Sequence, residues 1–138
     1  MTVLIIVGFI VGMIGLYLVF EYLNDVSMKN YSYEFFSIGH LIQVMIGYWI
    51  IFFGNNIYMK AAKASGDLLN GQLLIAIGVV VVLIVVYKNF KAVPFLVALA
   101  FTILELIICA PLAVGAFFIL VIAAAALAET KPVYVLNN

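Results

Sequence analysis

Long apolar stretches separated by short polar segments dominate the pattern of this chain. The apolar residues run continuously and do not alternate with polar ones, which is typical of helices and not of the strands of a membrane barrel. We expect membrane-crossing helices at 2–22, 35–58 and 72–87, followed by one longer apolar region. The pattern therefore predicts an all-α, polytopic transmembrane helical bundle of four to five spans, with residues 1–138 forming a single integral membrane domain.

The span count depends on the apolar region from Val93 to Ala128. As a helix it would be roughly 54 Å long, whereas the hydrocarbon core of a bilayer is about 30 Å thick. The region forms either two short spans, 94–109 and 112–128, joined by a tight hairpin near Pro111, or one long kinked helix over 94–128. The first alternative gives five spans and the second gives four.

A short motif favours the hairpin. Leu104-Glu105-Leu106, then Pro111-Leu112, then Gly115 resembles the hairpin turn of NfeD-type membrane proteins, which accompany stomatin-like proteins. The resemblance implies two short helices joined at this turn, although the soluble β-barrel domain common in that family is missing here. We therefore favour five spans.

Lysines set the expected orientation through the positive-inside rule. With five spans, Lys29, Lys88, Lys91 and Lys131 share one side of the membrane, which places the tail in the cytoplasm and the N-terminus outside. With four spans the lysines divide three and three, and the rule gives no orientation.

Composition supports a membrane location. Hydrophobic residues make up 69% of the chain and charged residues 9%, whereas soluble domains carry about 25% charged residues. The net charge is zero and no basic cluster is present, so nucleic acid is not an expected partner. The first segment lacks a basic leader, so we interpret it as a retained span. The expected partners are the lipid bilayer and other membrane subunits or further copies, in the cytoplasmic (inner) membrane of a bacterium.

Two sets of glycines mark expected helix-packing positions. Gly8, Gly12 and Gly15 form a notch on the first helix where another helix can approach closely. On the second helix, Gly47 and Gly54 continue a seven-residue repeat that begins at His40. This narrow stripe of small and polar residues indicates a buried seam between helices.

Polar residues at depth form a candidate intramembrane cluster, comprising Glu105, Gln43, His40 and Thr102. Ala98, Thr102, Glu105 and Cys109 follow one helical face. Counted at about 1.5 Å per residue, Gln43 and Glu105 lie within one turn of the same depth. We therefore expect their two stripes to face each other, with Glu105 protonated, hydrogen-bonded or facing water.

Two functions fit these residues. The first is a structural or accessory subunit of a larger membrane complex, in which the polar residues join helices, with His40 in an interhelical hydrogen bond. The alternative is a small oligomeric proton or ion channel or carrier that uses Glu105. No catalytic motif or metal-ligand pattern is present, and a single histidine cannot supply both ligands of a haem within one copy. We therefore expect no enzyme activity, no catalytic or metal site and no cofactor.

Overall fold

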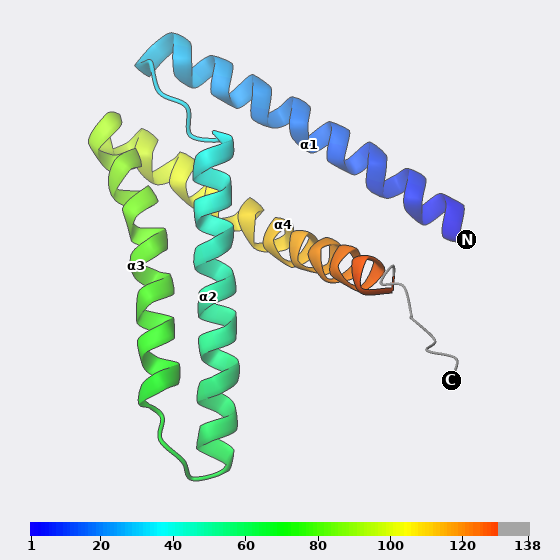
Figure 1. Ribbon diagram of the computed structural model, residues 1–138. Helices are drawn as coiled ribbons and strands as arrows, with labels where there is room; N and C mark the ends of the chain where they lie inside the picture. The colour runs from blue at the N-terminus through cyan, green and yellow to red at the C-terminus, as the bar shows by residue number, and fades with distance from the viewer. Residues whose placement is uncertain (130–138) are drawn as a thin grey trace, which may run out of the picture.

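A computed structural model describes residues 1–129, and the regular secondary structure of that part of the chain is all helical (Figure 1). All four helices are long and apolar enough to cross a membrane. Their bounds are α1 Thr2–Tyr31, α2 Ile38–Lys63, α3 Leu69–Ala92 and α4 Phe95–Glu129. These helices confirm the predicted all-α class and the membrane-like character of the chain.

Helices α1 and α3 extend further than the apolar pattern indicated, because polar residues at their ends continue the helix. Helix α1 ends at Ser32, whose backbone has φ 54° and whose N–H donates to the Met28 carbonyl oxygen. Helix α2 begins after Ser37, whose side-chain oxygen accepts from the His40 N–H. The segment between the two helices is therefore only six residues long, from 32 to 37, and it turns the chain back sharply.

Helices α2 and α3 form an antiparallel hairpin with a close glycine seam (Figure 1). A Cβ atom on Gly78 would lie 2.8 Å from the Gly47 carbonyl oxygen and 2.9 Å from the Ile51 nitrogen. One on Gly54 would lie 2.8 Å from the Ile75 nitrogen. The two backbones thus touch where no side chain fits, and Gly47 and Gly54 lie on the α2 side of this seam.

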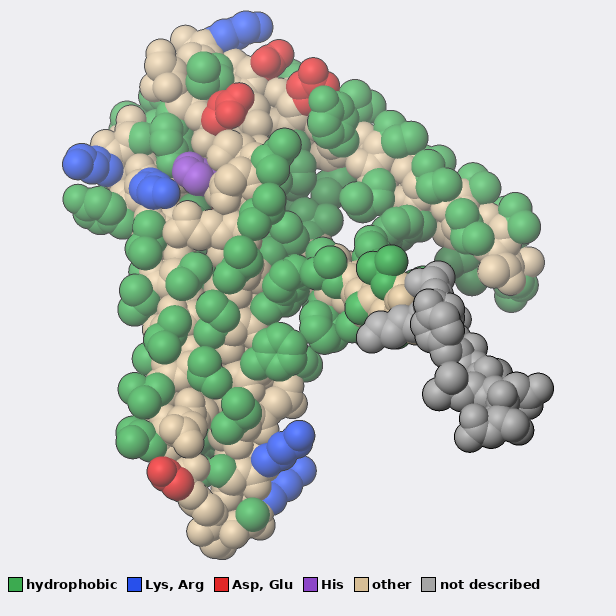
Figure 2. Space-filling model, viewed as in Figure 1, with side chains coloured by type: hydrophobic (Ala, Val, Ile, Leu, Met, Phe, Trp, Pro, Cys, Tyr) green, Lys and Arg blue, Asp and Glu red, His purple; other side chains and the backbone are tan. Residues whose placement is uncertain are grey.

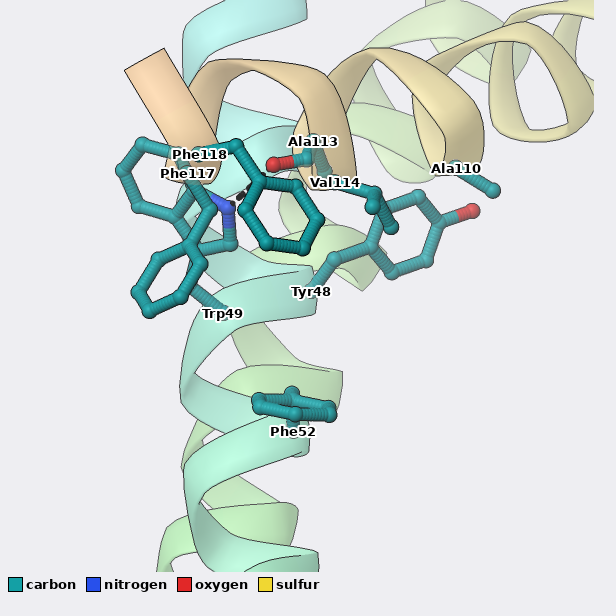
Figure 3. A pocket seen from close by; sticks show the side chains of 8 residues that line it. All are labelled: Tyr48, Trp49, Phe52, Ala110, Ala113, Val114, Phe117 and Phe118. Carbon is teal, nitrogen blue, oxygen red and sulfur yellow. Dashed lines mark hydrogen bonds between the residues drawn. The ribbon is translucent and has the colours of Figure 1, made fainter. Parts of the chain in front are cut away.

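Helix α4 crosses the α2–α3 hairpin obliquely, and two aromatic side chains of α2 bind its backbone (Figures 1 and 3). The Tyr48 hydroxyl donates to the Leu106 carbonyl oxygen at 2.8 Å. The Trp49 indole N–H donates to the Ala113 carbonyl oxygen at 2.8 Å. These two bonds hold α4 on either side of Pro111.

The predicted hairpin near Pro111 is wrong: α4 continues through this residue as one helix. Proline removes one backbone donor and usually disrupts a helix, but membrane helices tolerate it where neighbouring side chains bond to the backbone nearby. Tyr48 and Trp49 supply such bonds. The fifth span is therefore not formed within the described residues, and the alternative of one long helix from 94 is the arrangement observed. The tail with Lys131 lies outside the described residues.

Helix α1 is attached to the rest of the molecule only near its C-terminal end (Figure 1). There Phe20 stacks on Phe36 with ring centroids 4.8 Å apart. The Asn24 side chain accepts from the Phe36 N–H at 2.9 Å and donates to the Phe36 carbonyl oxygen. Beyond this junction α1 diverges from the other helices, so the expected bundle of all the helices is not confirmed.

The glycines of α1 have no close neighbour. A Cβ atom on Gly8, Gly12 or Gly15 would meet nothing within 4 Å. The close helix packing expected at this notch is therefore not made by the described part of the chain.

Two buried clusters join α2, α3 and α4. One lies at the junction of the two connecting segments, where Phe35 stacks on Phe101 with centroids 4.6 Å apart and Ala98 is buried beside them. The other lies deeper and contains Val44, Val85 and Cys109, one residue from each helix. Both clusters lie along the polar stripe of α4 and enclose its central part.

Candidate functional site

The structure assembles a buried polar cluster around Asn89, near the end of α3. The Asn89 amide nitrogen donates to Glu105 Oε2 at 2.8 Å and to Thr102 Oγ1 at 3.0 Å. Its carbonyl oxygen accepts from the Tyr33 hydroxyl at 2.8 Å. Asn89 and Glu105 are both fully buried, and Thr102 is 4% exposed. Three separate parts of the chain therefore meet at one amide side chain.

Asn89 uses all of its principal hydrogen-bonding groups in this arrangement. A side-chain amide has two N–H donors and one carbonyl acceptor, and each is bonded here. Glu105 is less fully bonded, because its Oε1 is buried without a hydrogen-bond partner in the described structure. The cluster contains no basic side chain. It therefore joins helices through amide, hydroxyl and carboxyl groups and not through an ion pair.

Tyr33 connects the cluster to the segment between α1 and α2. Its backbone carbonyl oxygen accepts from the Ser27 hydroxyl at 2.6 Å, which fixes this segment against α1. Burial, with a smaller contribution from the nearby Glu105 charge, raises the pKa of the Tyr33 hydroxyl to about 12. The phenol therefore keeps its proton at neutral pH and acts as a donor to Asn89.

The stripe of small and polar residues on α4 faces inward in the structure. Ala98, Glu105 and Cys109 are completely buried, and Thr102 nearly so. Thr102 and Glu105 are also brought together, since both accept from the same Asn89 nitrogen. This part of the predicted cluster exists, with an amide of α3 as its link.

Gln43 does not bond to Glu105, contrary to our expectation that their stripes face each other. The Gln43 amide donates instead to the Val81 carbonyl oxygen of α3 at 3.3 Å. The reason is that the glycine seam turns this side of α2 toward α3. The side that meets α4 carries Val44 and Tyr48. Equal depth in the membrane did not imply the same facing direction.

His40 also stays outside the cluster. It lies in the first turn of α2, and its Nδ1 is buried without a hydrogen-bond partner in the described structure. Its ring is 5.8 Å from the Tyr33 ring, centroid to centroid. Within residues 1–129, His40 Nδ1 thus makes no interhelical hydrogen bond of the kind we expected.

Asn89 is the residue that the sequence reasoning missed. The apolar pattern ended the third span at residue 87, whereas α3 continues to Ala92. A signal was nevertheless present: Gly71, Gly78 and Val85 repeat every seven residues, and Asn89 lies one turn beyond Val85. Those four residues are the buried positions of α3, so the small-residue stripe pointed directly to Asn89.

A second feature near α4 is an apolar pocket of about 450 Å³ at the crossing with α2. Aromatic rings form much of its wall, including Trp49, Phe52, Phe117 and Phe118 (Figure 3). The polar atoms of Tyr48 and Trp49 are already bonded to α4 carbonyls. The pocket therefore offers apolar surface and no free polar group for a hydrophilic ligand.

Fold and site together describe a membrane-type helical protein with one buried carboxyl held by an amide. No group of three or more His, Cys, Asp or Glu that could hold a metal ion occurs among residues 1–129. Searches against family models, curated proteins and solved structures found no match.

Proposed function

We propose that this chain is a structural or accessory subunit of a larger complex in a membrane, the expected one being the cytoplasmic membrane of a bacterium. The observation that carries the proposal is the separation of α1 from the other helices. An 18-residue apolar window of α1 has no buried residue, and its glycine notch is open. A membrane helix with such a notch is suited to packing against another helix.

The polar cluster supports the same proposal. Asn89 is poorly suited to pass a proton on. Its amide nitrogen donates two hydrogen bonds and has no lone pair available to accept a proton. Its bonds to Glu105, Thr102 and Tyr33 instead tie α3, α4 and the 32–37 segment together. This arrangement suits a rigid support for the connecting segments on one side of the membrane.

The test of this proposal is purification of the full chain from its native membrane in a mild detergent. We expect foreign membrane subunits in a fixed ratio to this chain. A preparation that contains this chain alone, whether as a monomer or as a closed ring of copies, would contradict the proposal.

A second candidate, proton or cation transport, is favoured by one observation. Glu105 Oε1 is fully buried and lacks a partner, and acids at membrane depth are commonly functional. Glu105→Gln separates the two candidates, because a neutral amide keeps a polar contact with Asn89 but cannot release a proton. A structural role predicts that Glu105→Gln retains assembly and function and that Glu105→Leu loses assembly. A transport role predicts normal assembly of Glu105→Gln without any proton or cation flux.

A further inference from the structure

The divergence of α1 leaves an apolar crevice between α1 and α4 with a volume of about 510 Å³. Gly8, Gly12 and Leu16 line it on one side, and Ile107 and Pro111 on the other. Gly8 and Gly12 are one helical turn apart, so they expose a strip of backbone along the crevice. Such a strip permits the close backbone approach by which membrane helices pack.

Acidic side chains lie at the end of α1 that leads into the α1–α2 connection. A pocket of about 490 Å³ there is lined in part by Glu21, Asp25 and Glu34. None of these acids forms an ion pair with a lysine among residues 1–129, and this includes Lys29, one turn beyond Asp25. Figure 2 shows acidic side chains gathered at the top of the molecule, with lysine atoms at their edge and further lysine atoms to the left of them.

The crevice and the acidic pocket belong to the same helix. Leu16 lines the first and Tyr17 the second, so the two surfaces are adjacent along α1. A membrane-crossing helix that continues along α1 past the crevice would end level with these acids. Lys or Arg at that end would meet unpaired opposite charge, whereas Asp or Glu would be repelled.

We propose that the α1–α4 crevice receives one membrane-crossing helix of another protein, whose Lys or Arg residues lie at the end beside Glu21, Asp25 and Glu34. The crevice walls supply packing at depth, and the acids select the direction of the incoming helix. This proposal rests on the proposed function, since it names the kind of helix that a larger complex would contribute.

The test uses the full chain, labelled with a fluorophore and reconstituted in phosphatidylcholine vesicles. The probes are two synthetic peptides with the same Leu/Ala membrane-spanning segment of about 20 residues. One peptide carries three Lys at one end, and the other carries three Glu there. By energy transfer we expect the lysine peptide to bind about five- to tenfold more tightly, since each exposed charge pair contributes modestly.

Two pairs of variants locate the binding surface. Glu21→Lys combined with Asp25→Lys should reverse the peptide preference, while the control Asp67→Lys, at the opposite end of the molecule, should not change it. Gly12→Leu should weaken binding about tenfold by filling the crevice. Its matched control is Gly115→Leu, because Gly115 also has open space around it but does not line the crevice. A Cβ atom added at Gly12 meets no atom within 4 Å, and the rest of the leucine side chain would extend into the crevice, so the variant should fold.

Equal binding of the two peptides would overturn the proposal, as would equal effects of Gly12→Leu and Gly115→Leu. Energy transfer between two labelled copies that Gly12→Leu abolishes would identify a second copy as the occupant and would also overturn it. The outcomes separate this inference from the proposed function. If the peptides fail while foreign subunits still co-purify, only the crevice assignment is lost.

Discussion

At the scale of single residues, Asn89 explains how an acid can lie buried in an apolar helix without a basic partner. The amide presents hydrogen-bond donors to Glu105 and Thr102 and an acceptor to Tyr33. Asn89, Glu105 and Thr102 are buried, so their polar groups would otherwise be left unsatisfied at considerable cost. The position of Asn89 thus determines how α3, α4 and the connecting segment are joined.

Replacing Asn89 by Ala should therefore lower the free energy of unfolding in detergent by ~1–3 kcal/mol, because buried polar groups lose their partners. The control is Asn56→Ala, whose side chain bonds only to the Phe52 carbonyl oxygen in its own helix and is exposed. That control should change stability much less. Equal effects of the two variants, measured by denaturant titration, would contradict the role of the cluster.

Tyr33 gives a prediction about alkaline pH. Its folded-state pKa is raised from 10.0 to about 12, so the folded protein holds the phenolic proton more tightly than the unfolded chain does. The stability from this group is complete below pH 10 and is lost as the pH rises toward 12. Tyr33→Phe should remove this part of the pH dependence, and the control Tyr22→Phe, at an exposed side chain, should retain it. The measurement is the unfolding midpoint as a function of pH, and identical profiles for the two variants would refute the assignment.

The sequence revealed the stripe Ala98, Thr102, Glu105 and Cys109 as an inward face, because helical periodicity is preserved in lipid. It did not reveal the partner of that stripe. Gln43 matched Glu105 in depth, but depth says nothing of rotation about the helix axis. The rotation of α2 is fixed by Gly47 and Gly54 against α3, and only the assembled fold contains this information.

At the scale of elements, the α2–α3 seam and the continuity of α4 organise the fold. The sequence indicated the glycine seam, because small residues recur every seven positions. The continuity of α4 was not, because the bonds from Tyr48 and Trp49 that hold the helix beyond Pro111 come from residues about sixty positions away. Local sequence around Pro111 favoured a turn, and tertiary contact prevailed over it.

Gly78→Ala tests the seam. The added methyl group would lie within 3 Å of backbone atoms of α2, which cannot move aside as a flexible side chain can. We expect a loss of ~1–3 kcal/mol in stability from this overpacking. Gly115→Ala, with no atom near the new Cβ, should be neutral or slightly stabilising because alanine favours a helix. A denaturant titration in which both variants resemble the parent protein would exclude close backbone contact at Gly78.

The two side-chain hydrogen bonds from α2 to the backbone of α4 can be tested by removing their donors. Tyr48→Phe combined with Trp49→Phe deletes the hydroxyl and the indole N–H and keeps aromatic side chains. We expect a loss of about 1 kcal/mol for each bond and a broader distance distribution between spin labels on α2 and on the second half of α4. Tyr22→Phe serves as the control for removing an exposed hydroxyl. An unchanged distance distribution in the double variant would mean that these bonds do not position α4.

At the scale of the whole molecule, α2, α3 and α4 pack against one another, and α1 leaves them after its C-terminal junction (Figure 1). Four helices that are long and apolar enough to cross a membrane would do so in alternating directions. The start of α1, the α2–α3 turn and the end of α4 would lie on one side, with the two remaining connections on the other. The α1–α4 crevice uses residues on both sides of Pro111 in the middle of α4, whereas the Asn89 cluster uses Thr102 and Glu105 before it.

The most direct test is side-specific labelling of single cysteines in sealed vesicles, in a background where Cys109 is replaced by Ala. The four reporter positions are Thr2→Cys, Ser32→Cys, Ser65→Cys and Ala128→Cys. An unbroken α4 predicts that a membrane-impermeant maleimide labels positions 2, 65 and 128 from the same side and position 32 from the other. Labelling of position 128 from the same side as position 32 would require α4 to turn back within the membrane, and it would contradict the account.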